Sequence, residues 1–194
     1  MNRHGLTSGC TLSAFGDTPT CTPEANETDG LWTALLLAAE AFRAAVTGAP
    51  DAIASATTFF QGMQLLNNIT GIPGLMARTV LSPTEAHPGG DYWYNATVPG
   101  FEGWVWQGNT SSDDVTGHMF GLPIFANVLG GTVADATIAA KLVGEIATYI
   151  AEHDYFLIDI NGLRTKWGVW NPAFMNTDQF WSDERYVVIS ASWH

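Results

Sequence analysis

The chain has 194 residues, enough for one domain with a substantial core, and a hydrophobic share of 46% excludes wholesale disorder. Its net charge of −12, with basic residues scattered singly, argues against nucleic acid and anionic membranes, because nothing would neutralise their phosphates. The apolar stretches are too short for a membrane span, so we expect a soluble protein.

The first 28 residues are rich in Thr, Ser, Pro and Gly, and we expect an irregular lead-in over 1–28. Cys10 and Cys21 bracket a short polar loop within it. Two cysteines placed in this way are typical of a disulfide in an exported protein. We therefore predict that Cys10 and Cys21 are bonded and pin the lead-in.

Four Asn-X-Ser/Thr triplets also favour a secreted or extracellular protein, since this is the acceptor pattern for N-glycosylation. Their asparagines are Asn26, Asn68, Asn95 and Asn109. The triplet is frequent by chance, so only some are expected to carry a glycan. Residues 1–5 lead into polar residues without the apolar core of a signal peptide. The alternatives are a mature or internal fragment of an exported protein, or a protein that stays inside the cell.

The first predicted helical hairpin has helices at about 29–46 and 51–68. Thr28 or Asp29 is a suitable N-cap for the first of them. Apolar residues surround this helix almost completely, which predicts burial on both sides. A connection of about three residues, with Gly and Pro, makes the pair antiparallel.

A segment without helices follows at 71–111, with short strand-like runs at 77–81 and 103–107. A stretch this long is usually functional; the alternative is a small β-excursion that covers one end of the helices. Its aromatics either line a surface on which sugar rings stack or plug loops onto the helices. The candidate substrate-binding aromatics along the chain are Trp32, Trp104, Trp106, Trp167 and Trp170.

The second predicted hairpin has helices from Ser112 to about 130 and from about 133 to 152. Ser111 or Ser112 is a fitting N-cap, and acids occupy the first turn, where the helix dipole favours them. We expect the first helices of both hairpins to lie side by side and parallel, with the second helices outside them.

A strand at 155–160, an Asn161-Gly162 turn and a returning strand at 163–167 then predict a β-hairpin. A partial fifth helix is predicted to open near 178–185.

Acidic residues beside a Trp or His open the first helix of each hairpin. If both are inner helices of a toroid, their N-termini share one face, where Asp29, Asp113 and Asp114 would gather. Paired carboxylates are what glycosidic bond cleavage requires, one as acid and one as base or nucleophile. The alternative is that these acids only cap their helices.

His118 lies four residues after Asp114, so the two share a helix face. It is either a general acid/base oriented by that carboxylate or a structural histidine. Arg78 either holds a carboxylated sugar or pairs with an acidic side chain. The sequence has no metal-binding signature and no nucleotide or phosphate fingerprint, so neither metal nor cofactor is expected.

Segments 29–32, 110–118 and 165–170 together resemble an (α/α)-toroid, six-hairpin glycosidase-like domain. That superfamily includes unsaturated glucuronyl hydrolases and polysaccharide lyases. Over about 29–172, the resemblance implies a mainly α fold of consecutive antiparallel helical hairpins and a carbohydrate cleft lined by aromatics and acids. It concerns architecture and transfers no catalytic role. Two hairpins are recognisable where six are needed, so 29–194 is expected to form a single, incomplete toroid.

The leading expectation is an exported glycoside hydrolase- or polysaccharide lyase-like domain. Asp113, Asp114 and Asp29 would be its catalytic carboxylates, with His118 assisting. One alternative is a non-catalytic extracellular glycoprotein module that binds glycans or partner proteins. Another is a structural part of a larger assembly, in which other hairpins or chains complete the ring.

Overall fold

A computed structural model describes residues 3–131 and 133–175, and about 47% of it is helical, so the fold is mainly α as predicted. The helices α1 to α5 and the 3-10 helix η1 span Asp29–Thr47, Pro50–Asn68, Ser112–Leu129, Asp135–Glu152, Pro172–Met175 and Thr18–Thr20. The strands β1 to β7 span Gly9–Thr11, Thr22–Glu24, Thr79–Leu81, Trp93–Asn95, Val105–Gln107, Phe156–Ile158 and Arg164–Val169. The predicted helix near 178–185 lies outside the described residues.

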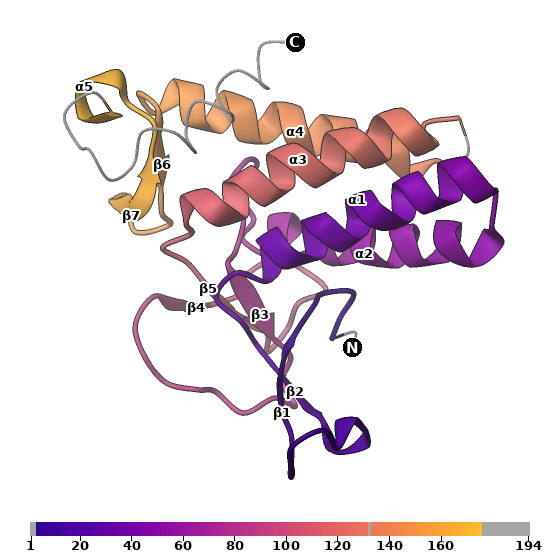
Figure 1. The fold of residues 1–194 in the computed structure, drawn as a ribbon. Coiled ribbons are helices and arrows are strands. Elements are labelled where there is room, and N and C mark those ends of the chain that lie inside the picture. Colours follow the sequence, from indigo (N-terminus) through magenta and orange to yellow (C-terminus); the bar gives the residue numbers. More distant parts are fainter. Residues whose placement is uncertain (1–2, 132, 176–194) are drawn as a thin grey trace.

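Helices α1 and α3 run side by side and parallel, as predicted (Figure 1). Gly117 of α3 lies against Leu31 of α1, and Gly121 lies against Ala34. The residue numbers in both helices rise from the first pair to the second, so the two helices run parallel. A β-carbon on Gly117 would stand 2.6 Å from the Leu31 Cα, so the missing side chain is what lets the two backbones approach. Helix α2 packs against α1, and α4 packs against α3.

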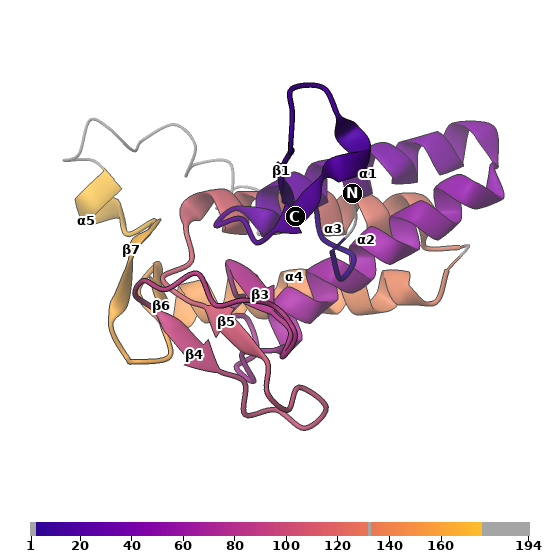
Figure 2. The ribbon, with the colours of Figure 1, turned by 90° about the horizontal axis from the view of Figure 1, so that it is seen from below.

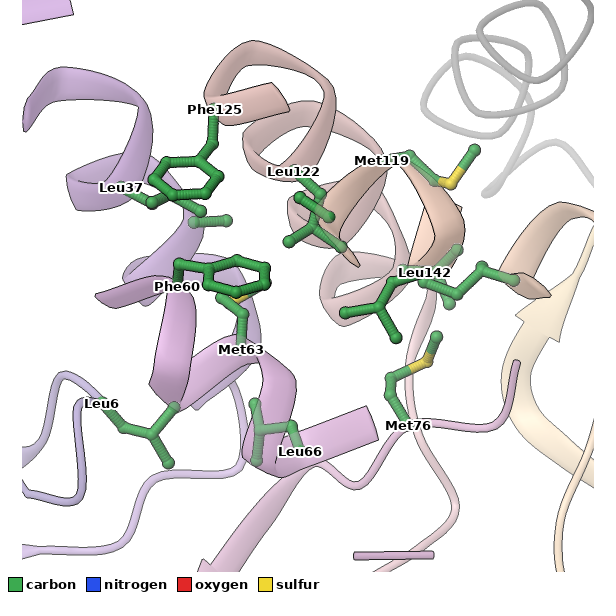
Figure 3. Packing of buried hydrophobic residues seen from close by; sticks show 14 of the residues in the cluster. Leu6, Leu37, Phe60, Met63, Leu66, Met76, Met119, Leu122, Phe125 and Leu142 are labelled. Carbon is green, nitrogen blue, oxygen red and sulfur yellow. The ribbon is translucent and has the colours of Figure 1, made fainter. Parts of the chain in front are cut away.

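The core lies among these four helices and includes Leu6 of the lead-in (Figure 3). Phe60 of α2 and Phe125 of α3 stack with ring centroids 4.8 Å apart. Leu6 is fully buried in the same cluster. The lead-in is therefore partly built into the domain and is less irregular than expected.

The prediction that the first helix is buried on both sides is wrong. One side of α1 packs on α2 and α3, but Leu35, Leu36, Phe42 and Val46 on the other side are exposed. An apolar sequence all round a helix shows only that it could be buried on every side. How much of it is buried depends on how many other elements pack against it. By length and hydropathy α1 is long and apolar enough to cross a membrane. This is weak evidence for a membrane span, because a core helix of a globular fold meets the same test.

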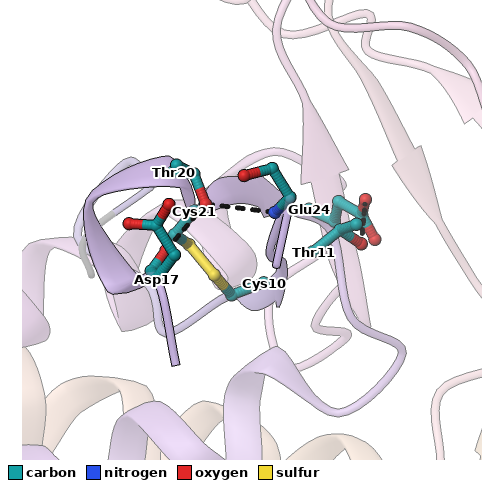
Figure 4. The surroundings of a disulfide bond; sticks show 7 residues. Cys10, Thr11, Asp17, Thr20, Cys21 and Glu24 are labelled. Carbon is teal, nitrogen blue, oxygen red and sulfur yellow. Dashed lines mark hydrogen bonds between the residues drawn. A yellow bond between two sulfur atoms is a disulfide. The ribbon is translucent and has the colours of Figure 1, made fainter. Parts of the chain in front are cut away.

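The lead-in also forms a small hairpin, β1–β2, closed by the predicted disulfide (Figure 4). Cys10 and Cys21 are bonded, with Cα atoms 5.4 Å apart. The strands pair antiparallel, and the hydroxyl of Thr11 donates to Glu24 at 2.8 Å. The disulfide is compatible with an extracellular protein.

The remaining strands gather at the end of the helical layer where α1 and α3 begin (Figure 2). One antiparallel sheet has the order β3-β5-β4; β3 and β5 fall in the predicted strand-like runs, whereas β4 was not predicted. Strands β6 and β7 form the predicted hairpin, with Gly162 in the left-handed conformation at φ +78°. The long segment between α2 and α3 thus covers one end of the helices.

Candidate functional site

The first turns of α1 and α3 meet directly, so the acids that open the two helices are brought together. A β-carbon on Gly30 would stand 2.9 Å from Cε1 of His118 and 3.0 Å from Oδ1 of Asp114. Glycine at this position therefore makes room for both side chains. The two helix starts converge, but Asp29 and Asp114 are buried, and only Asp113 lines a cavity.

Asp29 is fully buried and bound from two sides. Its Oδ2 accepts hydrogen bonds from Nη2 of Arg3 at 2.9 Å and from the hydroxyl of Thr79 at 2.5 Å. Burial raises the pKa of Asp29 to about 6, against the opposing effects of Thr79 and Arg3. Thr28 precedes the helix without capping it through its side chain. Asp29 thus anchors the lead-in and β3 to α1.

Asp114 is also fully buried, directly behind the N-cap of α3. The Ser111 hydroxyl donates to its Oδ2 at 2.9 Å and accepts from its backbone N–H at 3.4 Å, which confirms Ser111 as the cap. The Arg78 Nε lies 3.9 Å from the same carboxylate oxygen. Burial raises the pKa of Asp114 to about 7 despite these partners. Its Oδ1 has no hydrogen-bond partner in the described part of the chain.

His118 is fully buried one turn further along α3. Its Nδ1 lies 2.8 Å from the carbonyl oxygen of Asp114, so this nitrogen carries the proton of the neutral ring. Burial lowers the pKa of His118 to about 4. The pair is linked through the backbone carbonyl, so the carboxylate does not orient the imidazole in the way an acid/base role requires.

A cavity of about 240 Å³ opens at the start of α3. It is lined by Arg78, Ser111, Ser112, Asp113 and Trp167. Of the four predicted catalytic residues, Asp113 lines this cavity, whereas Asp29, Asp114 and His118 are fully buried and do not line it. A ligand can thus reach Asp113 without any rearrangement of the fold.

Arg78 forms one wall of the cavity and pairs with acidic groups, the alternative that sequence analysis left open. Its Nε donates to the Glu27 carbonyl oxygen at 2.9 Å, and its Nη2 lies 3.4 Å from the Glu27 carboxylate. Glu27 is 66% exposed, so a second carboxylate stands beside the cavity.

Trp167, on β7, gives the cavity an aromatic wall in addition to the charged wall at Arg78. The Lys166 ammonium lies 4.2 Å from the centre of its ring. The Lys166 backbone N–H donates to the side-chain oxygen of Asn109, and the Asn109 N–H donates to Asp159, both at 2.8 Å. These bonds tie the β6–β7 hairpin to the loop before α3 and set the position of Trp167.

The other predicted substrate-binding aromatics lie elsewhere. Trp106 and Trp170 are buried in the core, so the prediction that they bind substrate does not fit this structure. Trp104 packs edge-on against His4 with ring centroids 4.9 Å apart. Trp32 is half exposed near the start of α1, where its Nε1 donates to Thr28.

The four predicted glycosylation sites differ in their surroundings. Asn68 and Asn95 are exposed. Asn26 and Asn109 are partly buried, and their side-chain oxygens already accept hydrogen bonds from Thr28 and Lys166. The first two present their amide groups to an attached glycan more openly.

Sequence reasoning missed several residues that build the site: Arg3, Glu27, Gly30 and Thr79. Arg3 is one of only seven Lys and Arg residues, and that scarcity was a usable signal that it neutralises a particular acid. Its partner is 26 positions away, and nothing local in the sequence identifies it.

A larger cavity, of about 420 Å³, lies on the side of α2 and α4, and of the predicted site residues only the glycosylation candidate Asn68 lines it. Asn67, Phe101 and the Lys141–Glu145 ion pair contribute to its walls. The residues that the structure describes include no group of three or more His, Cys, Asp or Glu arranged to hold a metal ion.

Comparison with models of known protein families, with curated proteins and with solved structures finds no match to this chain.

Proposed function

We propose that this chain binds carbohydrate in the cavity at the start of α3. The observation that carries the proposal is the combination, in one cavity, of the Trp167 ring with the Asp113 carboxylate and the Arg78 guanidinium. A sugar has apolar ring faces and polar hydroxyl edges. An aromatic ring takes the face, and charged side chains bond the hydroxyls.

The size of the cavity suits a small part of a saccharide. Pockets for drug-sized ligands have volumes of roughly 300–1,000 Å³, and this one is about 240 Å³. We infer that one sugar unit enters it and that the rest of an oligosaccharide lies outside, towards Glu27 and Trp32. Both are exposed, Glu27 pairs with Arg78 of the cavity wall, and the Trp32 indole donates to Thr28, the neighbour of Glu27.

The architecture supports this assignment. The parallel pair α1 and α3, flanked by α2 and α4, is the arrangement expected of two consecutive hairpins of an (α/α) toroid. We propose that the chain is such an arc, in an extracellular protein, with its helix N-termini at the mouth. The disulfide between Cys10 and Cys21 accords with that location.

Cleavage of the bound saccharide is a second candidate function, and a specific observation favours it. The buried Asp114 carboxyl, with a pKa raised to about 7 by burial, is bonded at 2.9 Å to the Ser111 hydroxyl, which lines the cavity. Acid/base cleavage needs one protonated carboxyl and one carboxylate. For this step the Ser111–Asp114 hydrogen bond would have to reverse: protonated Asp114 donates to Ser111 while Ser111 passes its own proton to the leaving glycosidic oxygen. The Asp113 carboxylate would activate the water that attacks the sugar carbon.

Binding is tested by titrating the protein with neutral, acidic and amino-sugar oligosaccharides, followed by calorimetry and NMR. Trp167→Ala and Asp113→Asn are expected to weaken binding at least tenfold. Asp135→Asn is the matched control, because Asp135 occupies the first turn of α4 and does not line the cavity. The proposal fails if no oligosaccharide binds, or if the control weakens binding as much as Asp113→Asn.

Cleavage is tested on whichever oligosaccharide binds. Loss of turnover in Asp113→Asn with an unchanged melting temperature is expected of a catalytic role. Ser111→Ala should also abolish turnover, but it removes the N-cap of α3 and should lower the melting temperature as well. If the wild type binds without turnover, the chain is a carbohydrate-binding module and the cleavage candidate is discarded.

A further inference from the structure

One side of α1 presents a continuous apolar stripe to solvent. Leu35 and Leu36 are each 42% exposed, Phe42 is 50% exposed and Val46 is 85% exposed. Their spacing along the helix puts them on one side, opposite the residues that face α2 and α3. This is more apolar surface than isolated exposed residues normally account for.

Helix α3 extends this surface. Gly121 faces Ala34 of α1, and the preceding residue, Phe120, is 45% exposed. Leu35 follows Ala34 and is also exposed, so Phe120 and Leu35 lie at the same height on the solvent side of the seam between the helices. Figure 1 shows the two helices running together along their length. We call Leu35, Leu36, Phe42, Val46 and Phe120 the α1–α3 face.

The α1–α3 face carries almost no charge, although the chain has a net charge of −12. Positions 30–39 and 115–129 contain no Asp, Glu, Lys or Arg. Beside Phe42 on α1, Arg43 pairs with Glu40 at 2.7 Å and with Asp51 at 2.8 Å, so this group carries one net negative charge. Two copies of so acidic a chain repel one another through most of their surfaces. They would not repel through this one.

The area of the face is also sufficient. A fully buried aromatic side chain accounts for roughly 150–250 Å², so these half-exposed side chains leave on the order of 500 Å² of apolar surface on each copy. Two such faces brought together bury about 1,000 Å², the size at which specific interfaces begin. We propose that the chain forms a homodimer in which the α1–α3 faces of two copies pack against each other about a twofold axis.

A twofold interface needs a surface that is complementary to itself, and a neutral apolar face meets this requirement. The Leu and Phe side chains of one pair of helices would fill the spaces between those of the other. The cavity at Trp167 is lined by none of these residues, so the dimer and the carbohydrate proposal can fail independently.

The test is the molar mass in solution, measured by light scattering and analytical ultracentrifugation from low to high micromolar concentrations. The wild type is expected to be a dimer in reversible equilibrium with monomer. Leu35→Glu and Phe42→Glu should each shift the dimer dissociation constant upwards at least tenfold while circular dichroism stays unchanged. Ile138→Glu is the control, because Ile138 is a similarly exposed apolar residue on α4.

A wild type that is monomeric at every concentration overturns the proposal, as does a dimer that Leu35→Glu and Phe42→Glu leave intact. An apolar helix face could instead bind a lipid surface, and flotation with neutral phosphatidylcholine vesicles tests that alternative. A monomer that floats with the vesicles assigns the face to a lipid surface instead. If both Glu variants lose their helical signal, Leu35→Ser and Phe42→Ser replace them in the same measurement.

Discussion

Arg3 and Asp29 form an ion pair inside the protein, with Nη2 and Oδ2 separated by 2.9 Å and side-chain exposures of 6% and 0%. Arg3 also donates to the Val80 carbonyl oxygen at 2.7 Å and to Glu85 at 2.8 Å. One side chain near the N-terminus thus links the lead-in, α1 and β3. Breaking such a pair leaves a buried charge without compensation.

Replacing Arg3 with Met should therefore destabilise the fold by about 3–5 kcal/mol, as measured by urea unfolding near neutral pH. The double variant Arg3→Met/Asp29→Asn should recover part of the loss, because the uncompensated carboxylate is gone. Equal destabilisation in the single and double variants would show that the Arg3 contacts to Val80 and Glu85 matter more than the ion pair.

The seam between α1 and α3 depends on glycine. Gly117→Ala places a methyl group 2.6 Å from a backbone atom of Leu31, and overpacking of this kind costs about 1–3 kcal/mol. The control is Gly144→Ala on α4, where a β-carbon meets nothing within 4 Å. That change should instead stabilise the helix by up to about 1 kcal/mol. Thermal unfolding of the two variants should move in opposite directions.

The buried acids predict a pH dependence of stability. Burial raises the folded-state pKa of Asp114 from 3.8 to about 7 and that of Asp29 from 3.8 to about 6. The stability that each acid contributes is complete below pH 3.8 and is lost as the pH rises through its folded-state pKa. His118, lowered from 6.5 to about 4 by burial, acts in the opposite sense, and its contribution is lost as pH falls through 4.

Between pH 6.5 and 7.5 the effect of Asp114 should dominate, and the melting temperature of the wild type should fall as pH rises. Asp114→Asn removes this titration and should flatten the profile in that interval. Asp113→Asn serves as the comparison, since Asp113 lies on the cavity side. An unchanged slope in Asp114→Asn would mean that Asp114 is already ionised when the protein is folded.

The β1–β2 hairpin should depend on its disulfide. No residue of either strand is buried, so little besides the Cys10–Cys21 bond holds it. Reduction is expected to open residues 11–24 to proteases while the helical core keeps its melting temperature within a few degrees. Limited proteolysis with mass spectrometry, with and without reductant, locates the cuts. Cleavage spread equally over α1 to α4 would show that the hairpin supports the core.

The four long helices were predictable from sequence because their signals are local. The period of apolar residues, the Ser111 cap and the Gly and Pro stops all act within a few positions, and the predicted ends agree with the structure within about two residues. The disulfide was predictable for the same reason. Strand β4 was not, because its partner β5 is about ten residues away and pairing depends on where the chain returns.

The candidate site was predictable in location and only partly in chemistry. Asp113, Arg78 and Trp167 do line one cavity. The local sequence does not determine that Asp114 and His118 face inwards while Asp113 faces the cavity, because adjacent positions on a helix point about 100° apart. Nor does it distinguish Trp167, on the cavity, from Trp170, in the core three residues later.

The way Trp167 is held bears on how this protein could change over evolution. Its position depends on Asp159 and Asn109, whereas the tip of the β6–β7 hairpin, at Ile160 and Leu163, is exposed. Insertions or substitutions at this tip would alter the surroundings of the aromatic wall without touching α1 or α3. If the cavity binds carbohydrate as proposed, its ligand preference could therefore diversify among descendants of this chain while the helical scaffold and its buried acids stay constant.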